Sequence, residues 1–96
     1  MKTIWKFTFE PAFNLNTIIN LEMPDNPEIL CVKNQDEEIC LWAIVETTNE
    51  IYHFTFDIIP TGTELIDSYN IKRTYIDTVL LNDGKLVFHI FKREIK

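Results

Sequence analysis

Hydrophobic residues recur along this chain with a period of two, which differs from the period of about 3.6 that a helix requires. Near the start, Trp5, Phe7 and Phe9 alternate with smaller or more polar residues, and residues 18–23 and 51–56 show the same alternation. Successive side chains of a β-strand point to opposite faces, so this pattern predicts strands with one face toward a core. Strand-favouring Ile, Thr, Phe, Tyr and Trp are plentiful and Ala is scarce, which indicates a mainly β protein.

Turn signals divide the chain into seven predicted strands. The strands cover residues 4–9, 18–23, 29–33, 39–45, 51–56, 75–81 and 86–91. Polar or proline-containing turns separate them at residues 24–27, 34–38, 46–49 and 82–85. In the last of these, Asp83-Gly84 supplies the positive φ angles that tight hairpin turns require. Pro11 and the stretch around Asn14 and Asn16 are expected to end the first strand.

The run Ile39–Val45 is apolar on both faces. Such a run is typical of the central strand of a domain, or of a strand whose outer face is covered by another subunit. In the irregular segment 57–71, Thr61 and Glu64 have the spacing of a capping box, which predicts one short helical turn. We therefore predict a single β domain over residues 1–96. Its fold is a small antiparallel β-sandwich or partly open barrel of about seven strands, with at most one short helical turn.

The composition is that of an ordinary globular domain, with 96 residues of which 46% are hydrophobic and 25% charged. No apolar run is long enough to span a bilayer and the first residues lack a signal-peptide core, so we expect a soluble, cytoplasmic protein without membrane contact. A net charge of −6 argues against binding to duplex nucleic acid. Residues 1–71 carry three basic and twelve acidic side chains, whereas residues 72–96 carry six basic and three acidic ones. This asymmetry fits either a solvated surface or a patch that steers self-association or attracts a basic partner.

The two cysteines, Cys31 and Cys40, are too few for a disulfide framework and wrongly spaced for the usual zinc pairs. We expect reduced thiols. If the hairpin turns around residues 34–37, the two cysteines lie directly opposite each other, within disulfide range. The alternative is that they are simply two small, buried apolar residues.

No sequence motif indicates catalysis. Ser68 is the only serine, and Gly62 and Gly84 are the only glycines, so neither a nucleophile elbow nor a phosphate-binding glycine loop is present. The histidines and cysteines do not have metal-ligand spacing, and we expect neither a metal nor a cofactor. We expect a non-enzymatic protein. The remaining alternative is an enzyme in which Cys40 is the thiol nucleophile and His89 is its base.

His89 lies in the strand 86–91, which is apolar on both faces. It is either a core histidine bonded to a neighbour or a polar point in a pocket. His53 falls on the less apolar side of its strand and is expected at the surface. Aromatic residues are more numerous than one face of so small a core requires, so some of them could line a ligand site or a subunit interface instead of packing in the core. These residues are Trp5, Trp42, Tyr52, Tyr75 and Phe88.

Two sequence blocks are distinctive, Leu41-Trp42-Ala43-Ile44-Val45 and Leu86-Val87-Phe88-His89-Ile90-Phe91. Shorter motifs accompany them along almost the whole chain: Trp5-Lys6-Phe7, Met23-Pro24, Ile29-Leu30-Cys31-Val32, Gln35, Thr61-Gly62 and Tyr75-Ile76-Asp77-Thr78. In these residues the chain resembles a family of small uncharacterised proteins of tailed phages and prophages, grouped as a domain of unknown function. In the family pattern Thr-Gly is followed by His, whereas this chain has Thr63 there. An activity that needed that histidine would be lost, but a histidine that only shaped the loop is replaceable by Thr63.

The resemblance implies a phage or prophage accessory protein, and small phage proteins of this kind often antagonise host defence. The first hypothesis is a homo-oligomeric, non-enzymatic protein that sequesters a small nucleotide-like ligand. The two-faced apolar strands indicate the oligomer, and the Thr-Gly loop beside basic residues indicates a pocket in which phosphate would bind. The candidate ligand-binding residues are Trp42, Thr61, Gly62, Lys72, Arg73 and His89.

The alternative hypothesis is an acidic inhibitor that docks on a basic site of a host defence nuclease or regulator. Its docking face would comprise Glu22, Asp25, Glu28, Asp36, Glu37, Glu38, Glu46 and Glu50.

Overall fold

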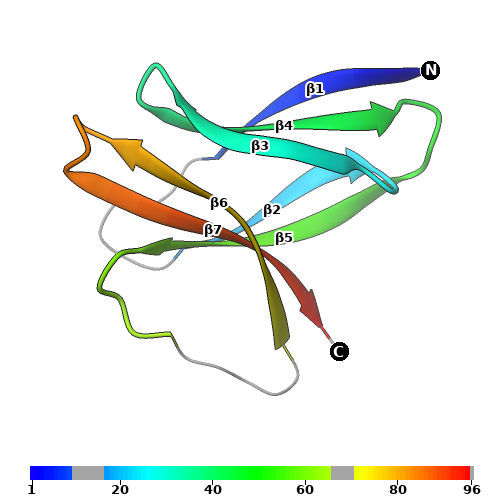
Figure 1. Ribbon diagram of the computed structural model, residues 1–96. Helices are drawn as coiled ribbons and strands as arrows, with labels where there is room; N and C mark the ends of the chain where they lie inside the picture. The colour runs from blue at the N-terminus through cyan, green and yellow to red at the C-terminus, as the bar shows by residue number, and fades with distance from the viewer. Residues whose placement is uncertain (10–16, 66–70, 96) are drawn as a thin grey trace.

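The computed structural model describes residues 1–9, 17–65 and 71–95, and it contains seven antiparallel strands in two sheets (Figure 1). The strands are β1 (Lys2–Phe9), β2 (Thr17–Pro24), β3 (Glu28–Gln35), β4 (Glu38–Glu46), β5 (Ile51–Pro60), β6 (Ile71–Leu81) and β7 (Leu86–Ile95). The three-stranded sheet has the order β1-β4-β3, and the four-stranded sheet has the order β2-β5-β7-β6. The predicted β-sandwich is confirmed, and the sheets do not close into a barrel.

The core lies between the two sheets and is built from the alternation seen in the sequence. Phe9 of β1 is 2% exposed and Phe56 of β5 is fully buried, and their rings meet edge to face with centroids 5.4 Å apart. Because these two residues belong to different sheets, their contact joins the sandwich across its centre. Trp5 belongs to the same face of β1 as Phe9 but remains 39% exposed, since β1 is an edge strand of its sheet.

β4 is the central strand of the three-stranded sheet, as the apolar run predicted. Leu41, Ala43 and Val45 on its inner face are buried in the core. Trp42 and Ile44 alternate with them on the outer face, where both are partly exposed. The inner face of β4 is therefore apolar because it packs in the core, whereas the apolar residues of its outer face remain partly exposed to solvent.

The predicted register of the β3–β4 hairpin is wrong by two residues. Asp36 and Glu37 have φ angles of 53° and 63° and form a tight turn, and Gln35 pairs with Glu38. A two-residue turn with both φ angles positive suits the twist of paired strands, and it shortens the loop that the sequence predicted. Cys31 consequently lies opposite Trp42, and Cys40 lies opposite Lys33. The cysteines are diagonal neighbours, which places their Cα atoms about 7–8 Å apart, beyond the usual disulfide range.

The predicted helical turn at Thr61–Glu64 is also wrong for the described part of that segment. The N–H of Thr63 donates to the carbonyl of Pro60 at 3.2 Å, and Gly62 between them has a φ of 89°. These features define a β-turn that needs glycine at its third position. Two predictions fall outside the described residues: the end of the first strand at Pro11, Asn14 and Asn16, and the remainder of the irregular segment, which includes Ser68.

The β6–β7 hairpin has the predicted turn, with positive φ angles at Asn82, Asp83 and Gly84. Its strands are longer than predicted, because β6 already begins at Ile71 and β7 continues to Ile95. A bulge between Tyr75 and Asp77 interrupts the pairing of the two strands. The extra pairs beyond the bulge join polar stretches that alternation alone does not identify as strand.

The edge of β3 lies beside β6 at one side of the sandwich (Figure 1), and hydrogen bonds join the two strands. Asp77, at the bulge, accepts a hydrogen bond from the N–H of Val32 at 3.2 Å. It also forms an ion pair with Lys33, with Nζ 3.2 Å from Oδ2. The Asn34 side chain donates to the carbonyl of Leu80 at 3.0 Å. Glu37 accepts a bond from the N–H of Asn82, and the pKa of Glu37 is lowered by this bond and, more strongly, by one from Asn34. We call this line of contacts the β3–β6 seam.

Asp77→Asn is expected to destabilise the protein near pH 7 and to lose that effect in acid. Burial raises the pKa of Asp77, but hydrogen bonds from the Val32 and Thr78 N–H groups and the contact with Lys33 outweigh it, so the pKa is lowered overall. A carboxyl group whose pKa is lowered by folding contributes stability above its unfolded pKa of about 3.9, and that contribution disappears as the pH falls through the folded pKa. Urea unfolding of both proteins at pH 7 and at successively lower pH should show the difference shrinking. Asp83→Asn, in the exposed turn, is the control, and a difference that stayed constant with pH would contradict this role.

Candidate functional site

The outer face of the four-stranded sheet carries the candidate site. Phe88 and Ile90 of β7 are buried in the core. The residues that alternate with them, His89, Phe91 and Arg93, therefore point to the outer face. This face combines aromatic, hydroxyl and charged groups, whereas the buried part of the inner face is apolar.

Both ring nitrogens of His89 have hydrogen-bond partners. Nε2 lies 2.7 Å from Thr61 Oγ1, and Nδ1 lies 3.1 Å from Thr78 Oγ1. The Thr78 hydroxyl is also 2.7 Å from the hydroxyl of Tyr75. A neutral imidazole offers one donor and one acceptor, and a hydroxyl can act as either, so this chain of four side chains is satisfied without a charge.

A pocket of about 240 Å³ lies between β7 and the turn that follows β5. Thr61, Thr63 and His89 contribute its polar side chains, and Ile59, Leu65 and Phe91 contribute apolar wall. The turn at Gly62 holds Thr61 over His89, because the hydrogen bond between the two side chains spans from the turn to β7. We call this the His89 pocket.

Beside the His89 pocket lies a buried charge cluster that the sequence analysis did not single out. Asp57 is only 4% exposed although it belongs to the outer face. Arg93 binds it side-on, with Nε 3.0 Å from Oδ2 and Nη2 2.6 Å from Oδ1. Arg73 donates from Nε to the same Oδ2 at 3.1 Å. The side chains of both arginines are largely buried, so the carboxylate is held between two guanidinium groups in a region with little water.

The structure brings three of the six predicted ligand-binding residues to one pocket and places a fourth on the same face. Thr61, Gly62 and His89 border one pocket, and Arg73 lies on the same outer face at the Asp57 cluster. Lys72 precedes Arg73 on β6, so its side chain points away from that face, and it is exposed.

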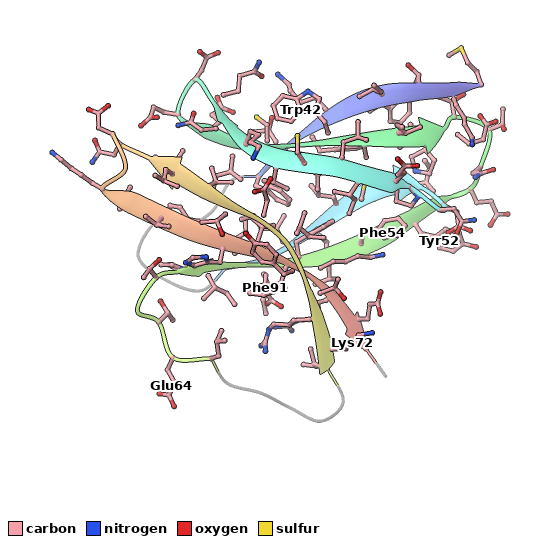
Figure 2. All side chains as sticks on the ribbon, viewed as in Figure 1. Trp42, Tyr52, Phe54, Glu64, Lys72 and Phe91 are labelled. Atoms are coloured by element: carbon pink, nitrogen blue, oxygen red, sulfur yellow. The ribbon has the colours of Figure 1, made fainter. Side chains whose placement is uncertain are left out.

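Trp42 lies apart from the other predicted ligand-binding residues. It belongs to the outer face of the three-stranded sheet, and Figure 2 shows it on the opposite side of the molecule from Phe91. Local alternation could not reveal this separation, because it does not state which sheet a strand joins.

The suggested couple of Cys40 and His89 is not formed. Cys40 belongs to the outer face of the three-stranded sheet, where its sulfur lies 3.7 Å from Thr8 Oγ1, whereas His89 belongs to the outer face of the four-stranded sheet. His53 is exposed, as expected, with Nε2 3.6 Å from Glu22. Within residues 1–9, 17–65 and 71–95, no cluster of three His, Cys, Asp or Glu side chains is placed to hold a metal ion, and no helix is long and apolar enough to cross a membrane.

The acidic residues of the alternative hypothesis do not share one face. Asp25 and Glu50 lie together at one end of the sandwich, where the N–H of Asp25 donates to the carbonyl of Glu50. Asp36 and Glu37 form the β3–β4 turn at the other end of β3. Glu22 lies on β2 in the other sheet. The single docking face expected from the sequence is therefore not present.

Some signal for the missed residues was present in the sequence. Asp57 is the only charged residue between Ile51 and Pro60, and a charge in such a run is costly unless a partner of opposite sign is close. The partners Arg73 and Arg93 are 16 and 36 residues away in the chain, so the sequence pattern does not identify them.

Comparison with known proteins assigns the chain to a family. No curated protein and no solved structure matches it. A family model described as a domain of unknown function, DUF7352, matches residues 1–96, which confirms the expected membership of a family grouped in that way. The chain belongs to the DUF7352 family.

Proposed function

We propose that this protein is a non-enzymatic binding protein that holds a small nucleotide-like ligand on the outer face of the four-stranded sheet. The observation that carries the proposal is the hydrogen bond between Thr61 and His89 on the wall of a largely apolar pocket. Few polar groups among apolar walls are the usual composition of a small-molecule site, because the walls supply affinity and the polar groups supply orientation.

The size of the His89 pocket limits what it can hold. About 240 Å³ is below the roughly 300–1,000 Å³ typical of drug-sized sites. The pocket therefore fits one ring system, and the rest of a larger ligand would lie along the outer face. Phe91 borders the pocket and contacts Tyr75 edge to face at 5.7 Å, so an aromatic surface continues in that direction.

The polar groups of the pocket can adapt to the edge of a nucleobase. Thr61 and Thr78 can each reverse donor and acceptor roles around His89, so the chain can present either kind of group to a ligand. In place of Trp42 and Lys72, the structure favours Phe91 and Tyr75 as neighbours of Thr61, Gly62 and His89.

The proposal includes a biological setting, a phage or prophage accessory protein that acts against host defence by sequestering a nucleotide signal in the cytoplasm. The support for this part is the sequence resemblance described above. In this setting the two hydroxyl partners of His89 have a role in binding the ligand.

The proposal also includes a homo-oligomer, with the outer face of the three-stranded sheet against a second copy of this chain. Trp42 and Ile44 at its centre are partly exposed and Ile4 is 56% exposed. Lys2 and Glu46 lie at the margin of this apolar centre. An apolar aromatic centre with a charged margin is the composition of a subunit contact.

Thr61→Val is expected to weaken ligand binding about fivefold, because it removes the hydroxyl that bonds His89 and leaves that nitrogen without its partner. Calorimetry of the wild-type protein with cyclic nucleotides and ADP-ribose would identify the ligand first, and native mass spectrometry of the same samples would give the ligand and subunit numbers. Thr74→Val, an exposed threonine on β6, is the matched control and should bind as the wild type does. Absence of heat with every nucleotide of the panel would refute the proposed function.

A further inference from the structure

A second pocket, of about 560 Å³, lies on the same outer face where β2, β5 and β7 run side by side. The polar residues that border it are Asn20, His53, Thr55, Lys92, Arg93 and Glu94. We call it the Arg93 pocket. It differs from the His89 pocket in carrying nitrogen donors from three strands.

The guanidinium of Arg93 has more N–H donors than its contacts with Asp57 use. Its Nε and Nη2 bind Asp57 through one edge of the guanidinium. A guanidinium has five N–H groups in a plane, so Nη1 and the second hydrogen of Nη2 form another edge, directed away from Asp57. The Asp57 contacts fix the plane of the group, and the side chain is only 17% exposed. Arg93 therefore offers a pre-oriented fork of the kind that binds an oxyanion through two parallel hydrogen bonds.

Asn20 is oriented in the same way by a neighbour. The Thr55 hydroxyl lies 2.6 Å from Asn20 Oδ1 and donates to it. This bond fixes which end of the amide is the acceptor, and it leaves the NH₂ group as the free end. Both residues border the Arg93 pocket, so a second nitrogen donor stands beside the guanidinium fork.

The other charged residues near the pocket lie beside residues of opposite charge. His53 borders it on β5 and has Glu22 at 3.6 Å. Lys92 lies over the ring of Phe54 at 5.4 Å and is 3.9 Å from Glu94, the acidic residue of the pocket wall. Lys92 precedes Arg93 on β7 and its side chain points away from the outer face, so the guanidinium of Arg93 is the positive group that this pocket presents to an anion.

We propose that the Arg93 pocket binds a phosphoryl group, with the free edge of Arg93 and the amide of Asn20 as its ligands. Arg93 follows His89 on β7 by four residue positions, a distance of about 13 Å along an extended strand. A nucleotide with its base in the His89 pocket reaches the Arg93 pocket with its phosphates. The placement of one nucleotide across both pockets rests on the proposed function, whereas phosphate binding at the Arg93 pocket can be tested independently of that function.

The first experiment titrates the full-length protein with inorganic phosphate at constant ionic strength and follows backbone amide shifts by NMR. Saturable shifts are expected at Asn20, Thr55 and Arg93. Asn20→Asp retains the acceptor for the Thr55 hydroxyl but replaces the donor by a negative charge, so it should weaken phosphate binding at least tenfold. Gln35→Glu is the matched control, because it makes the same change on the other sheet and keeps the bond that Lys6 donates to the Gln35 side chain. It should bind phosphate within twofold of the wild type.

Equal effects of the two substitutions, or shifts that chloride reproduces, would overturn the phosphate site. Acetate binding as strong as phosphate binding would overturn the assignment to a phosphoryl group and indicate a carboxylate ligand. Adenosine and its 5′-monophosphate separate this inference from the proposed function. Phosphate binding at the Arg93 pocket without adenosine binding at the His89 pocket would support the inference and refute the proposed function for that base, and the reverse result would refute the inference alone.

Discussion

Asp57→Ala is expected to lower the free energy of unfolding by about 3–5 kcal/mol, the usual cost of removing one partner from a buried ion pair. Asp57 is 4% exposed and accepts hydrogen bonds from both Arg73 and Arg93. Without the carboxylate, two guanidinium groups remain close together in a region with little water. Urea unfolding followed by tryptophan fluorescence would measure the loss.

Two further variants separate charge from size. Asp57→Asn keeps nearly the same volume, so a large loss in this variant as well assigns the effect to the missing charge. Glu64→Ala removes an exposed carboxylate that points away from the sandwich (Figure 2), and it should change stability by no more than about 0.5 kcal/mol. If Asp57→Ala were as mild as Glu64→Ala, the cluster would have no structural role.

Phe56→Ala is expected to cost about 3–5 kcal/mol, in the range measured for buried aromatic residues. Phe56 is fully buried and meets Phe9 of the other sheet at 5.4 Å, so its removal leaves a cavity where the two sheets are joined. The loss includes both the transfer of the ring from water and the contacts that its neighbours no longer make. Thermal and urea unfolding would both report it.

Tyr52→Ala is the control for this substitution on the same strand. Tyr52 is 48% exposed, so its truncation removes a ring of similar size from a site that is already half in water. We expect a loss of less than about 1.5 kcal/mol. Similar losses for the two variants would contradict the assignment of Phe56 to the centre of the core.

The strands could be predicted from the sequence because each one depends mainly on its own alternation. Trp5, Phe7 and Phe9 show this, since all three belong to the inner face of β1. The register of β3 on β4 could not be predicted as well, because it depends on the φ angles of Asp36 and Glu37. Several turn lengths were compatible with that polar stretch.

The candidate site was predictable only in part, for a related reason. Thr61 and His89 stood out as polar residues beside apolar strands, and they do come together. Arg93 and Asp57 were missed because each is unfavourable alone and acceptable only with the other, and 36 residues separate them. Trp42 was grouped wrongly because the assignment of strands to sheets is a property of the whole chain.

The β3–β6 seam has a consequence for aggregation. An edge strand presents unpaired N–H and C=O groups, to which a strand of another molecule can add. At this edge of β3 the N–H of Val32 already donates to Asp77. A bulge between Ile29 and Cys31 also makes the spacing of the backbone N–H and C=O groups along β3 irregular. An incoming strand would have to displace a charged side chain and match an irregular backbone. The β3–β6 seam therefore disfavours the addition of a strand at the β3 edge, and aggregation by strand addition would have to begin at another edge.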